Sequence, residues 1–141
     1  YKSGVDAFMK QAREGGKALT NIHHSDFIGR MDLAYAAADV VISRSGASTV
    51  SELCAAHKAA IFVPSPNVAE DHQTHNAMAL VRKDAAILVK DSEAQEKLLP
   101  AAIELLADSE RVRSMQENIA KLAKTDAAMT IAEEAYKLIG K

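Results

Sequence analysis

The sequence has few of the residues that mark secreted, membrane-spanning or nucleic-acid-binding chains. Its one cysteine, Cys54, cannot form an internal disulfide, which suits a reducing compartment. It has no tryptophan and only 4% aromatic residues, too few for a surface on which bases stack. No apolar run approaches the roughly 20 residues that span a bilayer, and no signal peptide opens the chain. We therefore expect a soluble, cytoplasmic protein.

The chain also lacks an excess of basic residues. Lysine and arginine number 17 against 19 aspartates and glutamates, for a formal net charge of -2. Proteins that bind the phosphate backbone of nucleic acids normally carry a basic excess, so we expect no nucleic-acid partner. Any phosphate that this chain binds should be held by backbone amides at the end of a helix.

Length and composition indicate one globular domain. The 141 residues are 48% hydrophobic and 26% charged, which is enough apolar material for a single core. The chain begins with Tyr1 instead of methionine, and its opening lacks the strand with which an α/β domain usually begins. We therefore expect residues 1–141 to be a single, N-terminally truncated domain.

Apolar runs alternate with helical patterns along the chain. Residues 40–42, 60–63 and 86–89 are apolar throughout, which is typical of strands buried on both faces, and 18–22 is a weaker strand candidate. Helical spacing follows in the segments 5–12, 31–38, 48–56, 72–83, from 92 onward, 109–123 and 127–139. This order predicts an α/β fold, a Rossmann-like parallel sheet with helices on both faces, and a helical C-terminal tail.

The first candidate site is the loop that follows the strand at 40–42. Ligands of parallel sheets bind beyond the carboxyl ends of strands. Gly46 permits close approach of a ligand to the backbone. The free amides of the next helix, from Ala47 through Ser48 to Thr49, point outward with the positive end of the helix dipole. These residues predict a phosphate site that needs no net positive charge.

Glu52 has two interpretations. It lies near the start of the same helix, where its carboxylate could accept hydrogen bonds from both hydroxyls of a ribose. Thr49 and Glu52 also have the spacing of a capping box, which would satisfy only the helix's own amides. The pattern alone favours capping.

The second candidate site is the loop over residues 64–76. Gln73 and Asn76 are about one helical turn apart, so their amides share a side, and amides that donate and accept suit sugar hydroxyls. The alternative is a solvated helix face. His72 and His75 are three residues apart, whereas zinc-binding pairs on a helix usually are four apart and have a third ligand. We therefore expect no metal and no cofactor, and we interpret Cys54 as a small buried hydrophobe.

At these two loops the sequence resembles the C-terminal domain of MurG glycosyltransferases. The matching stretches, in the family's order, are FIxxM at 27–31, ADVVISRSGAxTVSEL at 38–53, VPSP at 63–66 and EDHQTxNA at 70–77. Several ordered motifs are far more specific than any one of them. The resemblance implies half of a GT-B enzyme, in which two Rossmann-like domains enclose the active site.

The resemblance also implies roles for individual residues. Ile28 matches the position whose backbone reads uracil, and Glu52 matches the carboxylate that binds ribose. The segment from Gly46 to Thr49 matches the diphosphate site, and Arg44 in the same motif is a further substrate-binding candidate. His72 and Gln73 match the pair that contacts the sugar, supported by Asn76.

The implied reaction is the inverting transfer of N-acetylglucosamine (GlcNAc) from UDP-GlcNAc to lipid I, the undecaprenyl-pyrophosphoryl-MurNAc-pentapeptide, which forms lipid II in peptidoglycan synthesis. The family's glycine-rich opening loop and its acceptor domain, with the candidate base and the surface that docks on the membrane, are absent from these residues. We therefore expect no catalytic residue in this chain, and a peripheral location on the inner face of the membrane for the whole enzyme. The alternatives are a domain like that of UDP-GlcNAc 2-epimerase and a non-catalytic nucleotide-binding module.

Overall fold

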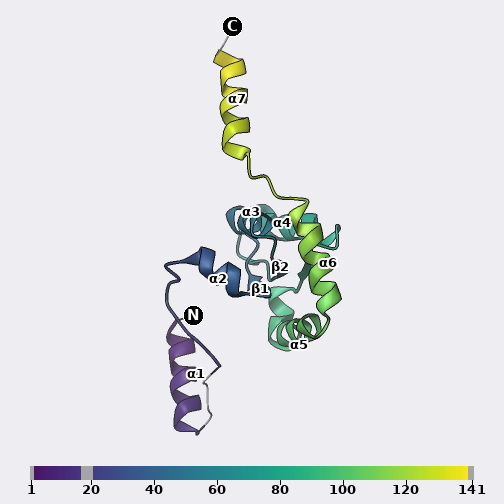
Figure 1. Ribbon diagram of the computed structural model, residues 1–141. Helices are drawn as coiled ribbons and strands as arrows, with labels where there is room; N and C mark the ends of the chain where they lie inside the picture. The colour runs from purple at the N-terminus through teal and green to yellow at the C-terminus, as the bar shows by residue number, and fades with distance from the viewer. Residues whose placement is uncertain (1, 17–20, 140–141) are drawn as a thin grey trace. The chain divides into compact units, whose positions relative to one another are not determined.

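The computed structural model describes residues 2–16 and 21–139 (Figure 1). The chain divides into two units, Tyr1–Ala34 and Tyr35–Lys141. No described helix is both long enough and apolar enough to cross a membrane. The prediction that the whole chain forms a single domain for a UDP-sugar stays a prediction.

The first unit contains helix α1, Lys2–Glu14. Met9 and Ala12 are its buried residues, as the helical spacing predicts. The helix ends at Gly15 and Gly16, and Gly16 has a φ of 74°, the left-handed conformation common after a helix. In the strand candidate at 18–22, residues 18–20 lie outside the described residues, and Asn21 and Ile22 belong to no strand.

The second unit contains a parallel sheet with the described strand order β1-β2-β3. The strands are β1 (Val40–Ser43), β2 (Ala59–Phe62) and β3 (Ala86–Leu88). The helices are α2 (Met31–Ala37, which begins in the first unit), α3 (Ala47–Ala55), α4 (His72–Val81), α5 (Ala94–Ala107), α6 (Ser109–Ala120) and α7 (Ala127–Ile139), with short 3-10 turns at Ala69–Asp71 and Asp91–Glu93. These bounds confirm the predicted strand and helix order from residue 31 onward.

The central strand β2 forms the middle of the core, because it is buried along its whole length. Its alternate side chains point to opposite faces of the sheet. Phe62 packs in one core cluster with Leu53 of α3 and Leu80 of α4. Ile61 packs in a second cluster with Leu105 of α5, and Met115 of α6 joins that cluster. Helices therefore cover both faces of the sheet, as predicted, and the fold is Rossmann-like.

Strand β1 differs from its predicted environment. The run at 40–42 predicts a strand buried on both faces, yet the Ile42 side chain is 46% exposed. Among the described strands β1 pairs with β2 alone, so it is an edge strand. Solvent therefore reaches a β-branched run that would be covered in the middle of a sheet.

Candidate functional site

The carboxyl ends of β1 and β2 lead into helices whose first turns are joined by hydrogen bonds. Ser45, in the loop before α3, is completely buried. Its hydroxyl donates to the backbone carbonyl of Gln73 in α4 at 2.8 Å. Its own carbonyl accepts from the Asn76 side-chain nitrogen at 3.1 Å. The start of α3 and the first turn of α4, which belong to two separate loops in the sequence, are therefore held next to each other.

Helix α3 begins with amides that its own side chains leave uncapped. Gly46 is the N-cap residue, no side chain accepts a cap hydrogen bond there, and the Val50 amide donates to the Gly46 carbonyl at 3.0 Å. The amides of the three residues between them have no acceptor within an α-helix. A side-chain Cβ atom at Gly46 would meet nothing within 4 Å beyond its own neighbours in the chain. The space at this positive helix end is therefore open to an anion.

The capping-box interpretation of Thr49 and Glu52 is wrong. Helix α3 begins at Ala47, so Thr49 is its third residue and cannot be the cap. The spacing of Thr49 and Glu52 fits a capping box, but the helix already includes the two residues before Thr49, Ala47 and Ser48. The Glu52 carboxylate is therefore not occupied by the amides of its own helix.

Glu52 instead has a partner from another helix. The Tyr35 hydroxyl of α2 donates to Glu52 Oε2 at 3.0 Å. Burial raises the pKa of Tyr35, and the hydrogen bond to the Glu52 carboxylate and its negative charge raise it further. No local sequence pattern predicts this pair, because the two residues are 17 positions apart and lie on different helices.

The first turn of α4 holds its side chains against the neighbouring loop. Gln73 Oε1 accepts from the Ser65 amide at 2.8 Å, which leaves the Gln73 amide nitrogen as the group that can donate to a ligand hydroxyl. Gln73 and Asn76 are half-buried and both have hydrogen-bond partners, so the solvated-face alternative is wrong for them. His72 is exposed, and its Nε2 lies 3.6 Å from Glu70 Oε2.

Arg44 connects the ends of all three strands. Its guanidinium donates to the backbone carbonyls of Val63 and Pro64 at 3.0 and 3.1 Å, in the segment that follows β2. It also pairs with Asp91, which follows β3. Arg44 therefore orders the carboxyl edge of the sheet, and its contact with a substrate stays a prediction.

Ile28 belongs to the first unit, and its side chain is 49% exposed. Its predicted contact with uracil therefore stays a prediction. Within the second unit, hydrogen bonds from Ser45 to Gln73 and Asn76 bring the loop before α3 beside the first turn of α4, whereas the printed partners of Glu52 and His72 are Tyr35 and Glu70.

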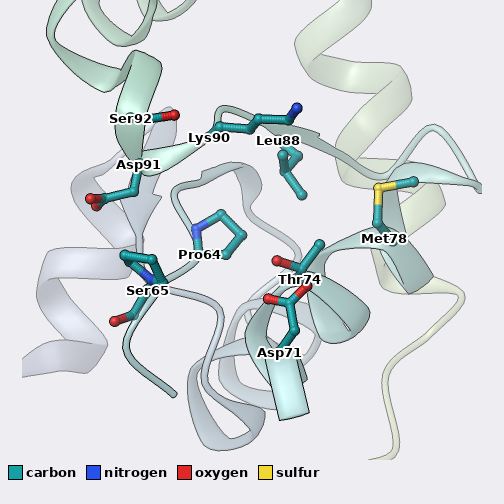
Figure 2. A pocket seen from close by; sticks show the side chains of 10 residues that line it. Pro64, Ser65, Asp71, Thr74, Met78, Leu88, Lys90, Asp91 and Ser92 are labelled. Atoms are coloured by element: carbon teal, nitrogen blue, oxygen red, sulfur yellow. The ribbon is translucent and has the colours of Figure 1, made fainter. Parts of the chain in front are cut away.

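A cavity of about 490 Å³ lies beside this site, at the carboxyl ends of β2 and β3 (Figure 2). Asp71, Thr74 and Met78 line it from α4 and the residue before it, and Lys90 and Asp91 line it from the segment after β3. None of the predicted site residues lines it. Five of its lining residues nevertheless come from the second predicted loop at 64–76, whereas the four that line it from β3 and the segment after it, residues 88 and 90–92, belong to no predicted motif.

Two other predicted features concern metals and thiols. No group of three or more His, Cys, Asp or Glu side chains that could hold a metal ion occurs in the described ranges. Cys54 is 4% exposed, and burial raises the pKa of its thiol. A buried thiol that stays protonated is a poor nucleophile, and Cys54 packs in the core as expected.

Comparison with known proteins agrees with this geometry. Residues 1–133 match the family model described as "Glycosyltransferase family 28 C-terminal domain". A protein of Bacteroides thetaiotaomicron is 57% identical over 130 residues, which are 92% of this chain and 35% of that protein. A protein of Bacteroides fragilis is 54% identical over 138 residues, 98% of this chain and 35% of that protein. Both relatives are named "UDP-N-acetylglucosamine--N-acetylmuramyl-(pentapeptide) pyrophosphoryl-undecaprenol N-acetylglucosamine transferase".

A solved structure agrees as well. The crystal structure of Acinetobacter baumannii MurG superposes with a TM-score of 0.76 at 33% identity, covering 82% of this chain and 33% of that one. A parallel sheet with ligand loops at its carboxyl edge defines a Rossmann-like α/β domain. The chain belongs to the glycosyltransferase family 28 C-terminal domain family. The predicted resemblance to the C-terminal domain of MurG is confirmed, and the chain spans about a third of the length of the curated relatives it matches.

Proposed function

We propose that this chain binds UDP-GlcNAc as the donor half of an inverting transferase that moves GlcNAc to lipid I, forming lipid II in peptidoglycan synthesis. The observation that carries the proposal is the bridge through Ser45, which joins an uncapped helix N-terminus to a helix turn with sugar-compatible amides. Diphosphate and hexose are adjacent in the donor, so neighbouring sites of these two kinds suit it. The names of the relatives support the same donor and acceptor.

We assign the diphosphate to the turn from Gly46 through Ala47 and Ser48 to Thr49. When the glycosidic bond breaks, negative charge grows on the departing UDP. Amides at a helix N-terminus are already oriented toward that charge, so they stabilise it without reorganising. Such preorganised dipoles lower the activation free energy of the transfer step. This is the contribution to catalysis that the chain's own residues support.

We assign the ribose to Glu52 and the sugar hydroxyls to His72 and Gln73, with Asn76 supporting them. Ile28 is assigned to the uracil edge through its backbone. Arg44 is assigned chiefly to the sheet edge, because its guanidinium already has several acceptors there. No described residue is assigned as the base that accepts the proton of the attacking hydroxyl.

We further propose that the base and the lipid I surface come from sequence outside these 141 residues, since the relatives are about three times as long. Inversion requires the acceptor hydroxyl to attack the anomeric carbon while a base removes its proton. A lipid-linked acceptor places the whole enzyme at the inner face of the cytoplasmic membrane, with peripheral attachment through that other part. Nucleic acid is no partner in this proposal.

The test is replacement of Glu52 in the full-length enzyme. Glu52→Gln keeps the size of the side chain but removes its charge, and we expect donor binding to weaken by about 1.5–3 kcal/mol. Product analysis with UDP-GlcNAc and a lipid I analogue should give the disaccharide-linked lipid. Conversion of UDP-GlcNAc to its 2-epimer would instead identify an epimerase, and binding without turnover would identify a regulatory module.

Glu96→Gln is a matched control, because Glu96 is exposed in the first turn of α5, a different helix. Its donor binding should equal that of the unaltered enzyme. If Glu52→Gln binds donor as tightly as this control does, the ribose assignment is wrong even where transferase activity is found.

A further inference from the structure

The Tyr35–Glu52 pair joins two helices at the edge of the proposed donor site. Tyr35 lies in α2 and is half-buried, and it packs against the core cluster around Leu53 and Phe62. Its hydroxyl reaches Glu52 Oε2 at 3.0 Å, and Glu52 is exposed. The tyrosine is therefore anchored by its ring, and the glutamate is held by the tyrosine.

Among the described residues, Tyr35 is the one side chain that donates a hydrogen bond to Glu52. A carboxylate has about four acceptor positions on two oxygens, so one bond at Oε2 leaves Oε1 and part of Oε2 for a ligand. An exposed glutamate otherwise samples many rotamers and loses that freedom when a ligand fixes it. A donor anchored in the core removes part of that cost before the ligand arrives.

We propose that Tyr35 is a positioning residue, which orients the Glu52 carboxylate toward the two vicinal hydroxyls of a ribose and so sets selectivity for ribonucleotides. This inference rests on the proposed function, because it requires Glu52 to bind the ribose. Tyr35 itself does not contact the nucleotide. Its effect is transmitted through one oxygen of Glu52.

The experiment compares two ligands on variants of the full-length enzyme. The ligands are UDP and 2′,3′-dideoxy-UDP. They differ only in the two ribose hydroxyls from which Glu52 would accept hydrogen bonds. The variants are Tyr35→Phe, which keeps the ring in the core, Glu52→Gln, and the double variant. Tyr136→Phe is the matched control, since it removes a tyrosine hydroxyl from a side chain that is 76% exposed in α7.

Calorimetric titration should give a clear pattern. Tyr35→Phe should weaken UDP by about three- to tenfold, the range expected for losing the preorganisation of one side chain, and leave the dideoxy analogue unchanged. The double variant should be no weaker toward UDP than Glu52→Gln alone, because Tyr35 acts only through Glu52. Tyr136→Phe should match the unaltered enzyme with both ligands.

Other outcomes separate the two proposals. If Glu52→Gln abolishes the preference for UDP while Tyr35→Phe keeps it, the positioning role is wrong and the donor site stands. Equal weakening of both ligands by Tyr35→Phe would also overturn positioning, in favour of a purely structural tie between helices. If the unaltered enzyme does not distinguish the two ligands, the ribose role of Glu52 fails, and the role of Tyr35 fails with it.

Discussion

The Ser45 hydroxyl lies 2.8 Å from the backbone carbonyl oxygen of Gln73, although the two residues are 28 positions apart. This bond crosses between the turns that follow two neighbouring strands. Asn76 adds a second bond from the same helix to the Ser45 carbonyl. Because Ser45 is fully buried, neither bond competes with solvent, and the two helix N-termini are held at a fixed separation.

Removing the Ser45 hydroxyl should therefore affect both stability and binding. Ser45→Ala removes a buried hydrogen bond to the Gln73 carbonyl, and we expect the free energy of unfolding to fall by about 0.5–1.5 kcal/mol. UDP affinity should fall as well, since the two turns lose their alignment. Urea denaturation and calorimetry measure the two effects. Ser48→Ala is the control for stability, because Ser48 is exposed in α3, and it should change the free energy of unfolding by less than about 0.5 kcal/mol. An equal loss of unfolding free energy in Ser45→Ala and Ser48→Ala would contradict the stabilising role of the Ser45 hydrogen bond.

Arg44 and Asp91 should contribute unequally to stability. Arg44→Ala removes donors from two backbone carbonyls as well as the ion pair, so we expect a loss of about 1.5–3 kcal/mol. Asp91→Asn should cost less than about 1 kcal/mol, because the paired side chains are 42% and 37% exposed and solvent weakens their attraction. Thermal and urea unfolding of both variants test this difference. Equal losses would mean that the ion pair, and not the carbonyl contacts, holds the sheet edge.

Local sequence patterns predicted the elements around the site well. The run at 60–63 corresponds to β2, and the helical spacing after residue 72 corresponds to α4, each within about two residues. Such patterns succeed because burial on both faces requires continuous apolar residues, and a helix core face requires its own period. The neighbouring turns of α3 and α4 also follow from the rule that parallel strands end at one edge.

The partners of the site residues could not be predicted in this way. Tyr35 meets Glu52 across 17 positions and Arg44 meets Asp91 across 47, and neither separation leaves a period or motif in the sequence. Thr49 and Glu52 did match a local motif, but the helix begins earlier than that motif requires. The contact with Tyr35 on α2, and not a capping contact within α3, is therefore the one that Glu52 makes, and a local motif does not contain that information.

UDP binding by this chain should require no divalent metal. The amides at the start of α3 supply partial positive charge to the diphosphate, and the sequence contains no Asp-x-Asp metal motif. We therefore expect the dissociation constant for UDP to be the same with EDTA and with added magnesium or manganese. Calorimetric titration under the three conditions decides the matter. Loss of binding on chelation would show that a metal, and not the helix end, neutralises the phosphates.

The hydroxyl of Tyr35 should make stability depend on pH in the alkaline range. Burial raises its pKa above the ordinary value of 10.0, and the Glu52 carboxylate raises it further. Tyrosine is neutral when protonated, so above its ordinary pKa the folded chain retains a proton that the unfolded chain has released. The resulting stabilisation is fully present below about pH 10 and is lost as the pH rises through the folded pKa. Tyr35→Phe should therefore lose less stability than the unaltered protein over that range.

Glu52→Gln separates the causes of this raised pKa. It removes the negative charge beside the phenol but leaves its burial, which is the larger cause, so the pKa of Tyr35 should fall only part of the way to 10.0. Titration of phenolate absorbance, with the Tyr35→Phe curve subtracted, isolates this one group from the other tyrosines. An unchanged Tyr35 pKa in Glu52→Gln would show that the hydrogen bond between the two helices does not persist in solution.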